Sequence, residues 1–135
     1  MKFFVSGRID DTRNVRIVID ALIAHGHSIT HDWTQSDTLL GGAAEKLNNA
    51  VESGMRAQND INGVLDADVY ILLSSNTTVG KGMYVELGAA LTAHQLHKRP
   101  KVYVIGPRNH LSVFYLHPAV IHKNTIEDVL TDLGN

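Results

Sequence analysis

The chain has 135 residues, no cysteine and a formal net charge of −2, with 44% apolar and 19% charged residues. This size fits one domain with its own core, spanning 1–135, and the lack of cysteine excludes thiol nucleophiles, thiolate metal sites and disulfides. The balanced charge gives no support for nucleic-acid binding, and no apolar run reaches the roughly 20 residues of a membrane helix. Because no signal-peptide pattern opens the chain, we expect a cytoplasmic protein without nucleic-acid or membrane partners.

The first third of the chain predicts a strand, a helix and a second strand. Residues 2–7 form a short apolar run that predicts a buried strand. Residues 10–26 predict a helix that ends at Gly26, and its inward stripe comprises Val15, Val18, Ile19, Leu22 and Ile23. Residues 27–33 predict a second strand, with one face formed by Ile29, His31 and Trp33.

The middle of the chain predicts a long helix, a buried strand and a further helix. Residues 43–65 have a helical pattern that Gly54 would bend or break, and the inward residues are expected to be Leu47, Val51, Met55, Ile61 and Leu65. Residues 68–75 form a clear buried strand. A loop of small polar residues and glycines then leads into a helix that ends near His97.

The last third predicts a fourth strand, an edge strand and a closing helix. Residues 101–106 are an apolar run, and 119–122 could add a short strand at the edge of the sheet. The closing helix spans 124–133, where Thr125 and Asp128 have the spacing of a capping box.

This alternation of strands and helices predicts a doubly wound α/β fold of the Rossmann or flavodoxin type. We expect three layers and a parallel sheet of four or five strands in an order near 2-1-3-4-5. Ligands of such sheets bind beyond the carboxyl ends of the strands, at the topological switch point. This rule selects four stretches as candidate ligand-binding segments: 6–13, 31–37, 74–86 and 106–110.

Two features of these stretches suit an anion, although the common phosphate-binding motifs GxxxxGK[ST] and GxGxxG are absent. The backbone of Gly80, Lys81 and Gly82 precedes a helix and could approach an anion closely. Arg8 and Arg13 flank the start of the first helix and could hold a phosphate bidentately. An equally good reading pairs these arginines with Asp10 and Asp11.

The eight histidines do not predict a metal site. His94 and His97 lie one helical turn apart, but no HExxH motif and no third ligand of suitable spacing accompanies them. Surface histidines explain the pattern better, so we expect no metal and no cofactor.

Glu86 is the strongest candidate for chemistry. It lies close to the predicted start of the helix that ends near His97, where the helix dipole and unpaired N–H groups favour a carboxylate. An ionised, fixed carboxylate could attack an electrophilic sugar carbon, as in covalent glycosyl transfer. The alternative is a surface acid that only complements the dipole.

Three segments, in this order, are similar to those of a known family. The first strand ends in VSG, followed by the loop with Arg8; QNDINGVLDADVYILL occupies 58–73; and GKGMYVELGAAL occupies 80–91. The third segment resembles a Gly-x-x-x-Glu-[Ile/Leu]-Gly-x-Ala signature, here Gly82, Glu86, Leu87, Gly88 and Ala90. Together they resemble the nucleoside 2-deoxyribosyltransferases and the related deoxynucleoside 5′-monophosphate N-glycosidases.

The resemblance implies that Glu86 is the nucleophile. In that family the glutamate attacks the anomeric carbon of a deoxyribose and expels the base, and a second base or water then resolves the glycosyl-enzyme. Asp60 matches the family's aspartate near the sugar, although it could equally be a helix-end acid. The resemblance thus implies cleavage or transfer at the N-glycosidic bond of a nucleoside or its 5′-monophosphate.

Further positions are carried over one at a time. Ser6 and Gly7 match the end of the first strand, where a small residue lets a ligand approach. Tyr84 could contact sugar or phosphate, or pack in the core. Trp33 follows the second strand, where an aromatic ring could stack on a nucleobase or simply cap the core.

One position departs from the family pattern. The transferases have an aspartate six residues before the nucleophile and the glycosidases often have a serine there, but this chain has Gly80. This puts both base exchange and phosphate binding in doubt, although nearby polar residues could substitute: Ser74, Ser75, Thr77, Thr78 and Lys81.

Two other functions remain open beside this one. The same strand, loop and glutamate resemble TIR-type domains, some of which cleave NAD at its N-glycosidic bond, and a non-catalytic nucleotide sensor would have the same pocket. We also expect a homo-oligomer, because family members commonly complete their sites with a neighbouring subunit. Residues 109–122 offer an apolar cluster for such an interface: Leu111, Val113, Phe114, Tyr115 and Leu116.

Overall fold

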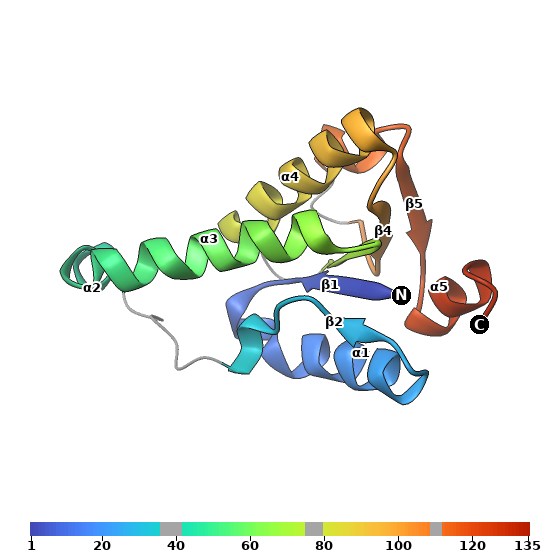
Figure 1. Ribbon diagram of the computed structural model, residues 1–135, viewed down its shortest axis with the longest axis horizontal. Coiled ribbons are helices and arrows are strands. Elements are labelled where there is room, and N and C mark those ends of the chain that lie inside the picture. The colour runs from blue at the N-terminus through green and yellow to red at the C-terminus, as the bar shows by residue number, and fades with distance from the viewer. Residues whose placement is uncertain (36–41, 75–79, 109–111) are drawn as a thin grey trace.

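A five-stranded parallel sheet forms the centre of the protein. The computed structural model describes residues 1–35, 42–74, 80–108 and 112–135. In these residues the strand order is β2-β1-β3-β4-β5, and every neighbouring pair is parallel (Figure 1). The strands are β1 (Lys2–Ser6), β2 (Ser28–Ile29), β3 (Val69–Leu73), β4 (Lys101–Ile105) and β5 (Val120–Lys123). The predicted doubly wound α/β fold and its strand order are confirmed.

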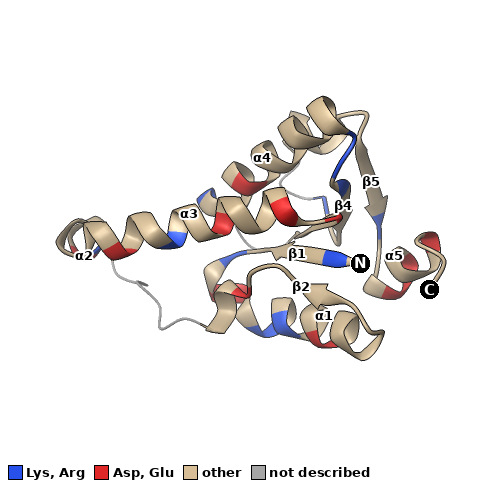
Figure 2. Ribbon diagram, viewed as in Figure 1, with Lys and Arg blue, Asp and Glu red and all other residues tan. Residues whose placement is uncertain are grey.

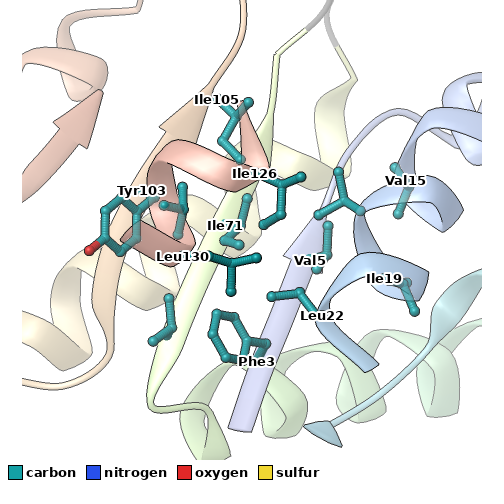
Figure 3. Close-up of a cluster of buried hydrophobic side chains, with 13 residues drawn as sticks. Phe3, Val5, Val15, Ile19, Leu22, Ile71, Tyr103, Ile105, Ile126 and Leu130 are labelled. Atoms are coloured by element: carbon teal, nitrogen blue, oxygen red, sulfur yellow. The ribbon is translucent and has the colours of Figure 1, made fainter. Parts of the chain in front are cut away.

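Helices cover both faces of this sheet. The helices are α1 (Thr12–Ala24), α2 (Ala43–Asn48), α3 (Ala50–Asp66), α4 (Lys81–His97) and α5 (Ile126–Asp132). Successive strand residues point to opposite faces, so Phe3 and Val5 pack with α1 and α5 (Figure 3), whereas Phe4 packs with α3 and α4. Short 3-10 turns occupy Ile9–Asp11, Trp33–Gln35 and Val113–Leu116.

The predicted ends of two helices are confirmed. Gly26 adopts φ +81° after α1, a conformation that favours glycine, and its N–H donates to the Ile23 carbonyl at 2.9 Å. At the start of α5, the Thr125 hydroxyl accepts from the Asp128 N–H at 3.1 Å and the Asp128 carboxylate accepts from the Thr125 N–H at 3.2 Å. Both bonds of the capping box are therefore present.

Two details of the first third were predicted wrongly. Ile23 is 55% exposed, whereas Val15, Val18, Ile19 and Leu22 are buried as expected. The second strand contains only Ser28 and Ile29, and the chain then turns through His31 into a 3-10 turn that begins at Trp33. The alternating pattern therefore continues beyond the point where β2 still pairs with β1.

The largest error concerns the predicted helix 43–65. It is broken at Asn49, between α2 and α3, and not at Gly54. Four residues expected inside have exposures from 48% to 80%: Leu47, Val51, Met55 and Leu65. For Leu47, Val51 and Met55 the reason is visible in Figure 1, where α2 and the first half of α3 project past the end of the sheet and have no strand beneath them.

Charge is mixed along the helices. Acidic and basic residues both occur on α1 and on α3 (Figure 2), in keeping with the net charge of −2. Among the described helices, none combines the length and the apolar character needed to cross a membrane.

Candidate active site

The candidate site lies where β1 and β3 end side by side. Ser6 is the last residue of β1 and pairs in register with Leu72 of β3. From these neighbouring strands the chain proceeds to opposite sides, to β2 and to β4, so this is the switch point of the sheet. Helix α4 begins at Lys81, beyond the carboxyl end of β3, and supplies Glu86.

Glu86 is buried against β1. Glu86 is only 9% exposed, and the Ser6 hydroxyl donates a hydrogen bond of 2.5 Å to Glu86 Oε1. This bond brings together two of the stretches that the strand-end rule selected, 6–13 and 74–86. A glutamate that only complements a helix dipole would lie in the first turn, but Glu86 is the sixth residue of α4.

The protonation of Glu86 differs from the sequence expectation. Burial, followed by the neighbouring Asp60 carboxyl, raises the pKa of Glu86 to about 8, while the Ser6 hydrogen bond opposes this rise. The helix dipole predicts the ionised form. Because the dipole effect is confined to the first turn, removal from water is the stronger influence here, and Glu86 holds a proton at neutral pH.

Asp60 faces Glu86 from α3. Burial also raises the pKa of Asp60, opposed by His31, by the hydrogen bond with Glu86 and by Arg56. The two carboxyl groups are therefore coupled and titrate as a pair. Near neutral pH Glu86 holds a proton, because its pKa is about 8. A pair that keeps a proton at this pH can both supply a nucleophile and protonate a leaving group.

Gly7 lets the end of β1 lie close to α1, and Gly80 lets the residue after Gly7, Arg8, lie close to the start of α4. A β-carbon at position 7 would lie 2.6 Å from Val15 Cγ2, and one at position 80 would lie 3.1 Å from Arg8 Cγ. Arg8 thus fills the space beside the start of α4 that a larger residue 80 would need. Its guanidinium also forms an ion pair with Asp10, as one of the two sequence readings proposed.

Other predicted binding residues surround this edge less closely. Arg13, Lys81 and Gly82 are exposed, on α1 and in the first turn of α4. Tyr84 is half-buried and its ring lies 6.0 Å from that of Tyr115, centroid to centroid. Residues 75–79, which include Ser75, Thr77 and Thr78, lie outside the described residues.

Trp33 closes the core at the same end of the sheet. Its indole N–H donates to the Val5 carbonyl at 2.8 Å. Its ring packs against the buried apolar side chains on both faces of the sheet. This arrangement is the core-capping alternative considered for Trp33. Its side chain is still partly exposed, at the end of the sheet where the candidate site lies.

Two residues of the site were missed by the sequence reasoning. The Nε2 atom of His31 lies 3.5 Å from Asp60 Oδ1, and Tyr70, fully buried on β3, donates its hydroxyl to the Met83 carbonyl at 3.3 Å. Burial, followed by the charge of Glu86, raises the pKa of Tyr70. The strand-end rule did select the stretch that begins at His31, but Tyr70 was hidden inside an apolar strand.

Metal binding has no support in the described part of the chain. In those residues no three His, Asp or Glu side chains lie close enough together to hold a metal ion. The polar groups that the fold brings together at this edge are the Glu86 and Asp60 carboxyls and the Ser6 hydroxyl.

Comparison with known proteins shows the fold of this chain in other proteins. No family model matches the chain, and a search of curated proteins finds no match. The CMP N-glycosidase BcmB of Clostridium botulinum is 13% identical, with both chains fully covered and a TM-score of 0.57. A conserved protein from Enterococcus faecalis V583 is 16% identical over 99% of this chain and 97% of its own, with a TM-score of 0.63. The α/β fold is thus shared over the whole chain with an N-glycosidase.

Proposed function

We propose that this protein cleaves or transfers at the N-glycosidic bond of a nucleoside, deoxynucleoside or its 5′-monophosphate. Glu86 is the nucleophile and Asp60 is its proton partner. The observation that carries the proposal is the pair of buried Glu86 and half-buried Asp60, with Glu86 bonded to Ser6 at the switch point of the sheet. The fold shared with a CMP N-glycosidase supports it.

The pair accounts for the protons of such a reaction. Glu86 passes its proton to Asp60 and attacks C1′; the C1′–N bond breaks, its electrons stay on the base, and Asp60 protonates the base. In the second step water attacks C1′ of the glycosyl-enzyme, Asp60 takes a proton from that water, and Glu86 leaves and regains the proton. This cycle needs no acid at position 80, which fits the glycine there.

The substrate would lie along the strand ends. In this proposal the sugar lies over Glu86, the base lies toward Trp33, and a phosphate lies toward Arg8, Arg13 or the backbone N–H groups of 80–82. Position 7 at the end of β1 has no room for a side chain, because a β-carbon there would collide with Val15 of α1.

Release of free base tests the proposal. The purified protein is incubated separately with CMP, with the deoxynucleosides, with their 5′-monophosphates including dCMP, and with NAD. Free base is measured by chromatography. We expect base release from at least one nucleoside or nucleotide, and a loss of several orders of magnitude in kcat for Glu86→Gln. Glu127→Gln, an exposed glutamate on α5, is the matched control and should retain wild-type kcat.

Each other outcome identifies a different function or mechanism. Wild-type turnover by Glu86→Gln would disprove the covalent mechanism. Release of nicotinamide alone would identify an NAD glycohydrolase, and no release from any substrate would favour a nucleotide-binding protein. Mass spectrometry of quenched reactions should detect the glycosyl group on the peptide that contains Glu86.

The protein is also proposed to self-associate. Apolar residues of two surfaces are more than half exposed: Leu47, Val51 and Met55 on α2 and α3, and Val113, Phe114 and Leu116 beside α4. Such surfaces are costly to leave in water. Tyr115, which the sequence reasoning added to this group, is instead buried, and Leu111 lies outside the described residues. Sedimentation at micromolar concentration should give a dimer or larger; a monomer mass would contradict this.

A further inference from the structure

The segment after β2 is held firmly against α3. The Thr30 hydroxyl donates to the Gly63 carbonyl at 2.7 Å, and the Thr30 N–H donates to the Phe3 carbonyl at 2.9 Å. A β-carbon at position 63 would lie 2.8 Å from His31 Cβ and 2.9 Å from Phe4 Cδ2. Gly63 therefore provides the space in which His31 packs against α3.

This packing directs His31 to Asp60, which lies one helical turn before Gly63 on α3. His31 Nε2 is 3.5 Å from Asp60 Oδ1, and that oxygen is buried without a hydrogen-bond partner among the described residues. The His31 side chain is 31% exposed and that of Asp60 is 26% exposed. The imidazole thus lies between solvent and the acidic pair, next to the one Asp60 oxygen that lacks a partner.

We propose that His31 is a positioning residue, whose imidazole orients the Asp60 carboxylate and supports its negative charge while Asp60 faces Glu86. This inference rests on the proposed function for its catalytic meaning, but its physical content does not depend on turnover. His31 does not touch the reacting atoms in this scheme. It acts through Asp60.

The charges around Asp60 determine what this contact does. Arg56 lies on the same helix, Glu86 faces Asp60 from α4, and His31 approaches from the segment after β2. Near the sheet, Ser6 and Tyr70 interact with Glu86. Burial raises the pKa of Asp60, and the charge of His31 opposes this rise and so favours the ionised carboxylate. His31 would therefore keep the proton of the pair on Glu86 and leave Asp60 free to accept it.

The first test follows the titration itself. Carboxyl resonances of 13C-labelled aspartate are recorded against pH in wild type, His31→Gln and Thr30→Val, with Asp60→Asn used for assignment. Removing a charge at this distance should raise the Asp60 midpoint in His31→Gln by about 1 pH unit. Thr30→Val keeps the imidazole but removes its anchor, so it should shift the midpoint in the same direction by less. His97→Gln, an exposed histidine at the end of α4, should leave it unchanged.

The second test measures catalysis on a substrate found by the base-release assay. The acid limb of kcat/KM should move to higher pH in His31→Gln, in step with the Asp60 midpoint, because two protons on the pair block the nucleophile. A role in folding alone would lower stability toward urea and leave both the midpoint and the limb in place. That result would overturn the inference.

The two proposals fail separately. If no base is released but the Asp60 midpoint moves in His31→Gln, the positioning of Asp60 stands and the glycosidic function falls. If base is released and the midpoint is unmoved, the function stands and the role of His31 falls. Should His31→Gln not fold, Thr30→Val still decides, because an unchanged midpoint with a loosened anchor would contradict the role of His31.

Discussion

The carboxyl groups of Glu86 and Asp132 both accept hydrogen bonds, yet their surroundings shift their pKa values in opposite directions. Glu86 is a buried residue of α4, on one face of the sheet, with the acid Asp60 beside it. Asp132 ends α5 on the other face and bonds to Lys101 at 3.0 Å, Lys123 at 3.2 Å and the Tyr103 hydroxyl at 2.5 Å. The first environment raises the pKa and the second, through these donors, holds the pKa of Asp132 well below its usual range.

The difference separates a functional candidate from a structural one. Two lysines and a tyrosine hydroxyl on β4 and β5 bind the Asp132 carboxylate. These bonds hold α5 against the sheet and explain why Asp132 is ionised. Glu86 is kept neutral at a cost that the fold could avoid by placing an apolar residue there. Such unrelieved perturbation in a strand-end site is typical of groups kept for chemistry.

The largest consequence of the Glu86 environment should be a loss of stability at high pH. Its pKa is about 8 in the folded protein against 4.5 for an ordinary glutamate, so the folded state binds the extra proton between these values. Stability is therefore full below about pH 4.5 and falls as pH rises toward 8. The shift corresponds to a loss on the order of 5 kcal/mol in the free energy of unfolding.

Urea unfolding of wild type and Glu86→Gln from pH 5 to pH 8 checks this. Glutamine resembles the neutral acid, so the two proteins should have similar stability at pH 5, and the variant should become the more stable as pH rises. Glu127→Gln should keep the wild-type slope. Parallel curves for wild type and Glu86→Gln would mean that Glu86 is ionised at neutral pH.

The fold was predictable because its signals are local and redundant. β1, β3 and β4 are apolar runs that fit only strands buried on both faces, and helices with one apolar face separate them. The rule for strand ends selected the stretches that contain Ser6 and Glu86, and the resemblance added Asp60.

The features that could not be predicted depend on which elements pack against one another in the folded chain. The apolar positions of α3 repeat with a helical period along its whole length, but only its second half lies over the sheet, so Val51 and Met55 are exposed and Val64 is buried. The contact of His31 with Asp60 depends on the space at Gly63, between segments about 30 residues apart. The hydrophobic periodicity of a sequence does not predict such a contact. It also does not predict the burial that raises the pKa of Glu86.

The smallest expected effect is that of Asp132→Asn, and its pH dependence has the opposite sign. Because the pKa of Asp132 is lowered from 3.8 in the folded state, its ionised form contributes stability above about pH 4 and loses it as pH falls further. The lysine partners are partly exposed, so the contribution is small and screened by salt. Thermal melting should show Asp132→Asn slightly less stable than wild type at pH 7 in low salt, with the difference shrinking in high salt and again in strong acid. A difference that grows on acidification would mean that Asp132, like Glu86, holds a proton in the folded protein.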